Sequence, residues 1–286
     1  KVVDDHLIFH DSMRESVRLG AGLTANKTLD KESQKRAIEC LKKFGERLRG
    51  LPPQAVRAVA TNTFRVAKNA PQLLKEAQEA LGFPIEIIAG REEARMIFVG
   101  VSHSLPKADH RRLVIDIGGG STEFVIGHRS VEKAKSVNIG CVRMSERHLV
   151  SDPATQEEIE SARRDIQAAI AEAAQVVDIK SAKSLIAVAG TATTVAAAAL
   201  ELPQYDRYAI HLSRISAEKT HEVSEMFLKM NRAQRAVLGY MHPGRVDVIG
   251  AGSLVLSEIV RAVGAKEFIA CESDILDGIA FSLGQS

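Results

Sequence analysis

Residues 116–123, which read Asp-Ile-Gly-Gly-Gly-Ser-Thr-Glu, place one carboxylate on each side of a glycine turn. The three glycines have no Cβ atoms, so backbone N–H groups can approach an anion closely. Oxygen ligands such as Asp116 and Glu123 suit Mg²⁺, which usually takes one or two protein carboxylates together with phosphate and water. The alternative interpretation is a glycine-rich hairpin turn with a structural aspartate. The flanking carboxylates and hydroxyls favour an anion and metal site over that alternative.

A second small-residue segment, residues 190–194, reads Gly-Thr-Ala-Thr-Thr. It follows a predicted strand and opens a predicted helix, and the N–H donors of a helix N-terminus form a natural phosphate site. Many turns between a strand and a helix have this composition, however. By itself the segment fits a structural turn equally well.

Two further segments contain charged groups that could act on phosphate. Glu92 and Glu93 are adjacent on a predicted helix, where neighbouring side chains point about 100° apart, so at most one of them faces a given site. Acidic residues also favour helix starts, and spacing alone favours a solvated helix start here.

Arg65 lies in residues 61–69, at a strand end. It could bind two phosphate oxygens or serve equally well in a surface ion pair.

Composition limits the classes of protein to consider. The 286 residues are 45% hydrophobic and 26% charged, as in an ordinary globular protein, and the formal charge of +2 gives no basic field for nucleic acid. Three widely spaced cysteines without a CxxC pair argue against a disulfide scaffold and a zinc cluster. No apolar run reaches the roughly 18 residues of a membrane span. With no signal peptide at its start, the sequence predicts a cytoplasmic protein.

Alternating strands and helices must position these residues, which indicates an α/β protein. Asp30 predicts the cap of a first helix, and Thr155 with Glu158 predicts a capping box for a later one. Further helices are predicted over residues 71–81, from residue 90 and over 274–283. Strands are predicted over residues 56–61, 85–88, 112–117, 122–126, 185–188 and 268–270.

Taken together, these segments resemble the Ppx/GppA phosphatase family, which contains exopolyphosphatases and guanosine pentaphosphate phosphatases. The resemblance extends along almost the whole chain, and its combination of motifs is specific although no single motif is. The matching residues are Val17, Arg18, Leu19, Gly20 and Gly22; Thr61, Arg65 and Asn69; Gly90, Glu93, Ala94 and Arg95; residues 116–123; Gly140 and Arg143; Gly190 and Thr191; Arg235, Pro243, Arg245, Asp247 and Gly252; and Asp274 and Gly278.

The resemblance implies two ribonuclease-H-like domains of the actin-like ATPase superfamily, facing each other across a cleft. We expect domain I to comprise residues 1–97 and 274–286 and domain II to comprise residues 98–273. The family's first phosphate loop, of the type Asp-x-Gly-Ser-Asn-Ser, is expected just upstream of Lys1. Without that loop the chain as given is expected to be inactive. Longer members of the family also have a helical region beyond the position of Ser286.

The resemblance also implies roles for individual residues. Glu93 is expected to be the catalytic carboxylate, and Asp116 with Glu123 is expected to organise Mg²⁺. Arg65 is expected to bind phosphates further along the substrate. The other expected phosphate-binding residues are Gly118, Gly119, Gly120, Ser121, Thr122, Gly190 and Thr191.

The predicted function is an exopolyphosphatase that releases orthophosphate from the end of inorganic polyphosphate. A pppGpp 5′-phosphatase requires the same groups and is the alternative. An actin-like sugar or acid kinase and a non-catalytic sensor are less favoured, because the sequence shows no adenine pocket or acceptor motif and retains Glu93. The predicted partners are polyphosphate or pppGpp and a second copy of the chain, without nucleic acid or membrane insertion.

Overall fold

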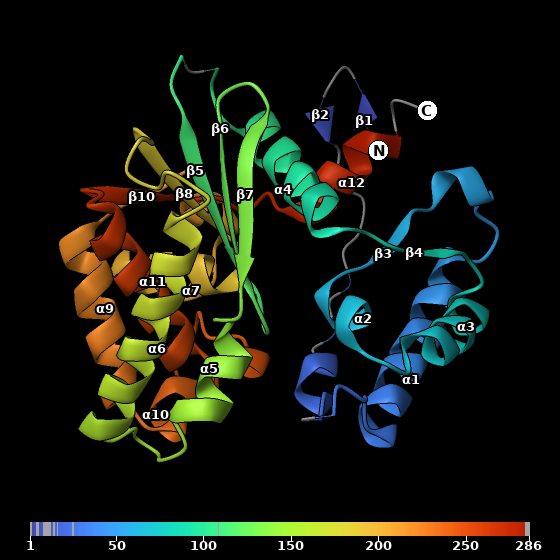
Figure 1. Cartoon of the computed structure of the whole chain (residues 1–286), viewed down its shortest axis with the longest axis horizontal. Coiled ribbons are helices and arrows are strands. Elements are labelled where there is room, and N and C mark those ends of the chain that lie inside the picture. Colours follow the sequence, from blue (N-terminus) through green and yellow to red (C-terminus); the bar gives the residue numbers. More distant parts are fainter. Residues whose placement is uncertain are drawn as a thin grey trace.

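The computed structural model describes residues 2–3, 6–7, 13, 15, 17–24, 26–107 and 109–283. They form a smaller N-terminal part and a larger C-terminal part built around one sheet (Figure 1). The two parts face each other across a cleft that residues from both of them line. Among the described residues, no helix has both the length and the apolar character needed to cross a membrane.

The N-terminal part combines short strands with two long helices. The helix α1 begins where Asp30 accepts a hydrogen bond from the Ser33 backbone N–H, as its sequence predicted. α1 packs against α3, and β3 pairs with β4 in parallel. The elements are β1 (Val2–Val3), β2 (His6–Leu7), the 3₁₀ turns Leu19–Gly22 and Pro53–Ala55, α1 (Lys31–Leu48), β3 (Ala58–Ala60), α2 (Asn62–Val66), α3 (Ala70–Leu81) and β4 (Ile85–Ile87).

The C-terminal part is organised by a six-stranded mixed sheet of order β7-β6-β5-β8-β10-β9. The first three strands form an antiparallel meander, and β8 and β10 then add in parallel to β5. β9 closes the far edge in the antiparallel direction. The strands are β5 (Arg112–Ile117), β6 (Thr122–Gly127), β7 (Val131–Val137), β8 (Ser184–Val188), β9 (Arg214–Ser216) and β10 (Glu267–Ala270).

Both faces of this sheet are covered, because successive strand residues point to opposite sides. On β5, Leu113 and Ile115 belong to the larger hydrophobic core, whereas Val114 belongs to a smaller core on the other face. The larger core is completed by α5 (Cys141–His148), α6 (Gln156–Ala174), α7 (Ala189–Ala199), α9 (Ala217–Lys229) and α11 (Ile249–Val263). The shorter helices are α8 (Arg207–Ile210), α10 (Arg232–Ala236) and the 3₁₀ turn Pro243–Arg245.

The smaller core is covered by α4 (Gly90–Ser104), which packs on β5, β6 and β7 through Ala94, Ile97 and Phe98. The closing helix α12 (Ile275–Leu283) packs on α4 (Figure 1). The two helices can pack this closely because Gly278 has no side chain: a Cβ atom at this position would overlap the backbone carbonyl of Met96. α4 runs unbroken past Ile97, where the domain boundary was predicted, and the division into domains stays a prediction.

Most predicted elements are present with boundaries within a few residues of those expected. Residues 190–194 follow β8 and open a helix, as predicted, but they lie inside α7 itself, which begins at Ala189, and not in a turn before it. Ala189 itself has a φ of 62°, in the left-handed region that non-glycine residues rarely adopt. Its backbone therefore makes the sharp bend at the end of β8, and the residues after it are already helical.

Candidate active site

Two carboxylates lie opposite each other at one end of the sheet. Asp116, near the end of β5, is the register partner of Glu123, near the start of β6. Alternation along each strand places them on the same face as Val114 and Val125, which is the face that α4 covers. The two carboxylates therefore lie beneath the N-terminal turn of α4.

Burial and neighbouring negative charges raise the pKa values of both carboxylates. Ser121 Oγ and Ser136 Oγ each donate a hydrogen bond of 2.7 Å to Glu123 Oε1. Burial, followed by the charge of Glu93, nevertheless raises the pKa of Glu123 to about 6. Burial, then the charges of Glu123, Asp274 and Glu93, raises the pKa of Asp116 well above its usual range. The charges of three carboxylates from three other segments thus act on Asp116, and such clustering is common at functional sites.

Glu93 faces this cluster from α4, and its side chain is only 9% exposed. Arg65 Nη1 lies 2.7 Å from Glu93 Oε2 but donates its hydrogen bond to the Ile88 carbonyl at 2.8 Å. Within the part of the chain that the structure describes, Glu93 Oε2 accepts no hydrogen bond. Glu93 Oε2 thus has Arg65 as a charged neighbour but no aligned donor, so it can still accept a hydrogen bond from a water molecule or substrate. Its neighbour Glu92 instead points away and pairs with Arg95 at 2.8 Å.

The glycine turn presents its amide groups to the cleft. The carbonyl of Gly118 accepts from the Cys141 N–H, and the carbonyl of Gly119 accepts from the N–H groups of Val142 and Arg143. In a trans peptide the N–H points away from the preceding carbonyl, so the N–H groups of Gly119 and Gly120 point away from α5. Neither donates to another group among the described residues. Two unused donors on adjacent residues are a suitable site for an anion.

Close approach of Gly140 fixes this turn. A Cβ atom on Gly140 would overlap the Gly119 carbonyl and would come within 2.5 Å of Gly120 N. Only glycine allows the N-terminus of α5 to rest directly on the turn. The orientation of the turn amides therefore depends on a residue about twenty positions further along the chain.

The second predicted phosphate segment lies on the other side of this turn. Gly190 is in the first turn of α7, and the guanidinium of Arg245 lies where a Cβ atom on Gly190 would be. The Thr194 hydroxyl donates to the Gly190 carbonyl at 2.7 Å. Thr191 is buried, and its hydroxyl contacts Cys141. Glycine is thus required here for the approach of an arginine, and the phosphate role stays a prediction.

The predicted residues divide between two adjoining cavities. The first, of about 920 Å³, is lined by Glu93, Asp116, Gly118, Gly119, Gly120, Ser121 and Glu123. The second, of about 810 Å³, is lined by Gly190 and Arg245, and the two cavities share Arg18, Gly119 and Val142. Three predicted residues line neither cavity: Arg65, Thr122 and Thr191. The Thr122 hydroxyl donates to the Ile139 carbonyl at 2.9 Å and so has no proton left for a phosphate oxygen.

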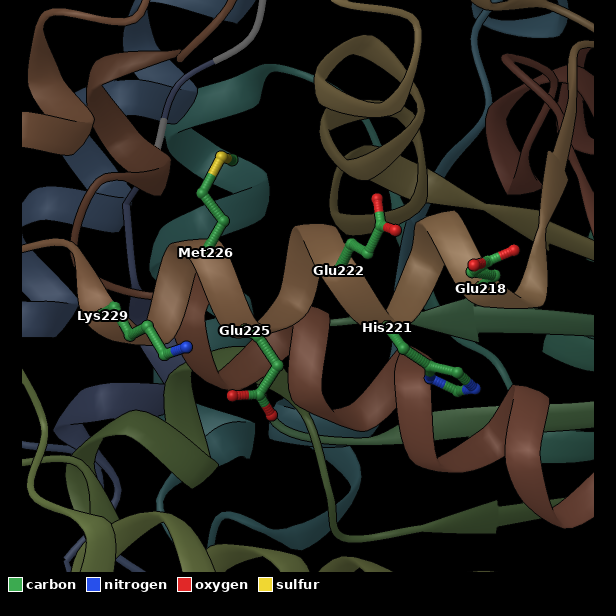
Figure 2. Close-up of a pocket in the computed structure, with 6 residues that line it drawn as sticks. All are labelled: Glu218, His221, Glu222, Glu225, Met226 and Lys229. Carbon is green, nitrogen blue, oxygen red and sulfur yellow. The ribbon is translucent and has the colours of Figure 1, made fainter.

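A third hollow, of about 900 Å³, runs along α9 (Figure 2). All of its lining side chains come from this one helix: Glu218, His221, Glu222, Glu225, Met226 and Lys229. His221 Nδ1 lies 2.7 Å from Ser257 Oγ, a contact within the larger core region. The hollow contains none of the predicted site residues and shares no element with the glycine turn.

The predicted Mg²⁺ site can be compared with the carboxylates that the structure places at the sheet edge. Among the described residues, no group of three or more His, Cys, Asp or Glu side chains is arranged to hold a metal ion. Mg²⁺ commonly needs only one or two protein carboxylates, and Asp116 with Glu123 supplies two on one strand pair. A cation would also offset the burial and the neighbouring negative charges that raise their pKa values. The residues present therefore fit Mg²⁺, and the metal itself stays a prediction.

The sequence interpretation did not place Asp274 in the site, although its charge acts on Asp116. Asp274 follows β10, which runs parallel to β8, and β8 runs parallel to β5. The carboxyl ends of adjacent parallel strands meet at one edge, which is where such sheets bind ligands. A carboxylate four residues after the last strand was the signal that could have identified it.

The sheet edge brings clustered carboxylates, free turn amides and the buried Glu93 together at the cleft between the two parts, an arrangement suited to phosphoryl transfer. The chain matches the Ppx/GppA phosphatase family over residues 1–286 and belongs to that family. The resemblance predicted from the motifs is therefore confirmed.

Individual relatives agree with this assignment. The chain is 39% identical over 285 residues to a protein named exopolyphosphatase 2 from Mycobacterium tuberculosis, covering 96% of this chain and 89% of the relative. It is 37% identical to an exopolyphosphatase-like protein of known crystal structure, with a TM-score of 0.87 and coverage of 94% and 89%. An exopolyphosphatase from Cytophaga hutchinsonii, 24% identical, shares the fold with a TM-score of 0.83 over 100% of this chain and 93% of that one. The predicted fold class, two ribonuclease-H-like domains facing across a cleft, is confirmed.

Proposed function

We propose that this chain is an exopolyphosphatase, which hydrolyses the terminal phosphoanhydride of inorganic polyphosphate and releases orthophosphate. The observation that carries the proposal is the buried Glu93, in the same cluster as Asp116 and Glu123; its Oε2 forms an ion pair with Arg65 but accepts no aligned hydrogen bond among the described residues. Two relatives at 37% and 39% identity, named an exopolyphosphatase-like protein and an exopolyphosphatase, support polyphosphate as the substrate.

The residues suggest roles in the reaction. Glu93 would accept a proton from a water molecule that attacks the terminal phosphorus in line with the bridging oxygen. That P–O bond breaks, orthophosphate forms, and the bridging oxygen leaves on a chain one phosphate shorter. The N–H groups of Gly119 and Gly120 would donate to the non-bridging oxygens of the transition state. Mg²⁺, when held by Asp116 and Glu123, would neutralise part of the phosphate charge.

Hydrolysis of pppGpp would use the same groups and is not favoured by the names of these relatives. The full-length protein should therefore release orthophosphate from polyphosphate with a higher kcat/KM than from pppGpp, measured side by side with Mg²⁺ present. An equal or higher value for pppGpp would contradict the proposal. Release of orthophosphate without any acceptor molecule would also exclude the kinase and sensor alternatives.

Mg²⁺ dependence is tested by Asp116→Asn. Replacing a charged oxygen ligand by an amide weakens the hold on a cation that sheds its water reluctantly, so the Mg²⁺ concentration for half-maximal activity should rise at least about tenfold. The control is Asp109→Asn, an exposed position before the other end of β5, which should leave the titration unchanged. An unchanged Mg²⁺ titration for Asp116→Asn would remove Asp116 from the metal's surroundings.

A homodimer and a cytoplasmic location are included in the proposal as predictions from the sequence. The oligomeric state is measured by light scattering of the full-length protein at several concentrations. A mass equal to one chain at every concentration would contradict the dimer.

A further inference from the structure

Three arginines line the larger cavity of the cleft, and two of them are paired with acids. Arg18 Nη2 lies 2.9 Å from Asp247 Oδ2, and Arg147 forms an ion pair with Asp165. Arg143, which is partly buried, has no carboxylate within ion-pair distance among the described residues. Arg143 is thus the one of these three arginines with no ion-pair partner among the described residues, although the charge of Glu146, which also lines the cavity, acts on it.

The position of Arg143 is fixed by the glycine turn. Its backbone N–H donates to the Gly119 carbonyl at 3.0 Å, so its side chain starts from the first turn of α5 directly beside the turn. Arg143 Nη2 lies 3.8 Å from the point that a Cβ atom of Gly120 would occupy. Asn62 Nδ2, from α2 in the N-terminal part, lies 3.9 Å from the same point. Donors from both sides of the cleft thus converge on Gly120.

The energetics of this arginine favour an external anion. Burial, with a smaller contribution from the charge of Arg147, lowers the pKa of Arg143, and the charge of Glu146 opposes this only in part. Removing a guanidinium from water without a partner costs free energy that an anion can compensate. A guanidinium has the planar donor fork that matches two oxygens of one phosphoryl group.

We propose that Arg143 is a substrate-binding residue that holds a phosphoryl group against Gly119 and Gly120, with Asn62 donating from the opposite side of the cleft. This inference rests on the proposed function, because it assigns a contact to the same substrate. Arg143 contributes binding and orientation, whereas Glu93 takes the proton.

The test measures equilibrium binding of tripolyphosphate to the full-length protein by calorimetry, in a Glu93→Gln background that prevents turnover. Arg143→Met should raise the dissociation constant about 10- to 100-fold, since a hydrogen-bonded charge contact to phosphate is lost. Arg143→Lys keeps the charge but not the planar fork and should fall between the parent and Arg143→Met. The control is Arg147→Met, one turn further along the same helix, which changes the net charge equally and should raise the constant less than about threefold.

A dissociation constant within about threefold of the parent for Arg143→Met would overturn the inference. Equal weakening by Arg143→Met and Arg147→Met would also overturn it, because net charge alone would then explain the result. Thermal melting of each variant verifies that it is folded, and Arg143→Lys supplies the comparison if the methionine variant is not. Failure of the proposed function gives a different result. In that case the protein with Glu93 intact would release no orthophosphate, while the dissociation constants for tripolyphosphate would still differ among the Arg143 variants in the expected order.

Discussion

At the scale of single residues, Glu93 and its neighbour Glu92 each lie beside an arginine, but only Glu93 belongs to the buried carboxylate cluster. Glu93 is buried beside Asp116 and Glu123, whereas Glu92 is occupied by Arg95. We expect Glu93→Gln to lower kcat at least about a hundredfold, because the amide keeps the shape but cannot take a proton. Orthophosphate release measures turnover, and calorimetry with tripolyphosphate verifies that substrate still binds.

Glu92→Gln is the matched control, and it should retain most of the wild-type kcat because only an exposed ion pair is removed. If Glu93→Gln kept more than about a tenth of the rate, the base would have to be another group.

The buried carboxylate cluster around Glu123 lowers the free energy of unfolding by an amount that depends on pH. The pKa of Glu123 rises from 4.5 to about 6 in the folded protein, so the folded state holds this proton more tightly than the unfolded state does. The stabilisation from the protonated form is complete below pH 4.5 and is lost as the pH rises through about 6. Glu123→Gln, which keeps an oxygen to accept from Ser121 and Ser136, should therefore raise the free energy of unfolding at pH 8 by about 1–2 kcal/mol.

Thermal melting in the presence of a metal chelator measures this change in stability. The melting temperature of Glu123→Gln should be a few degrees above that of the wild type at pH 8. At pH 5 the rise should largely vanish, since Glu123 in the wild type is already mostly protonated there. Glu132→Gln on the neighbouring strand β7, which removes an exposed pair with Arg111, should change little at either pH. A lower melting temperature for Glu123→Gln at pH 8 would contradict the interpretation of the cluster.

The choice between Glu92 and Glu93 illustrates what a sequence cannot supply. Their spacing alone favoured a solvated helix start, and only the resemblance to a family selected Glu93. Which of them faces the sheet depends on how α4 lies across β5, β6 and β7. That packing involves residues far apart in the chain, such as Phe98 and Val125, and no local pattern encodes it.

At the scale of elements, the strands and helices were largely predictable because each has its own periodicity and caps. β5 and the capping box of Thr155 and Glu158 appear where the sequence placed them. The start of α7 was not predictable, because it depends on the left-handed backbone of Ala189, which alanine does not favour. The orientation of the turn amides likewise depends on contact with α5, a tertiary contact that glycine content alone does not reveal.

The crossing of α4 and α12 is the element contact most sensitive to a single added carbon. A Cβ atom on Gly100 would overlap the Asp274 carbonyl and lie 2.9 Å from Gly278 N. We expect Gly100→Ala to lower the free energy of unfolding by about 1–3 kcal/mol, because a tightly packed contact must separate. Denaturant unfolding measures the stability, and kcat should fall as well, since α4 positions Glu93.

Gly90→Ala in the same helix is the control, because the nearest atom to its added Cβ is Arg65 Nη2, at 4.0 Å. That variant should be as stable as the wild type or slightly more so, since alanine favours helix more than glycine does. Equal stability of the two alanine variants would show that α4 and α12 do not depend on this contact.

At the scale of the whole molecule, the charges limit how a long substrate can be held. The formal charge is only +2, and several arginines near the cleft are already engaged. Asp247, for example, pairs with both Arg18 and Arg232. A long polyanion is held mainly by many weak, salt-sensitive contacts, and these require a continuous basic track. The described residues that line the larger cavity include acidic as well as basic groups.

We therefore expect this chain to cut long polyphosphate distributively, releasing the shortened chain after one or a few cuts. Dissociation should compete with the next cut, because a site dominated by Arg143 and the turn amides holds mainly the end of the polymer. Early in the digestion of long polyphosphate, gel electrophoresis should show a spread of intermediate lengths. Raising the salt concentration should shorten each encounter further, since the remaining contacts are largely electrostatic. Full-length polymer together with orthophosphate alone, with no intermediate lengths, would contradict this expectation and would indicate a basic track that the paired arginines do not provide.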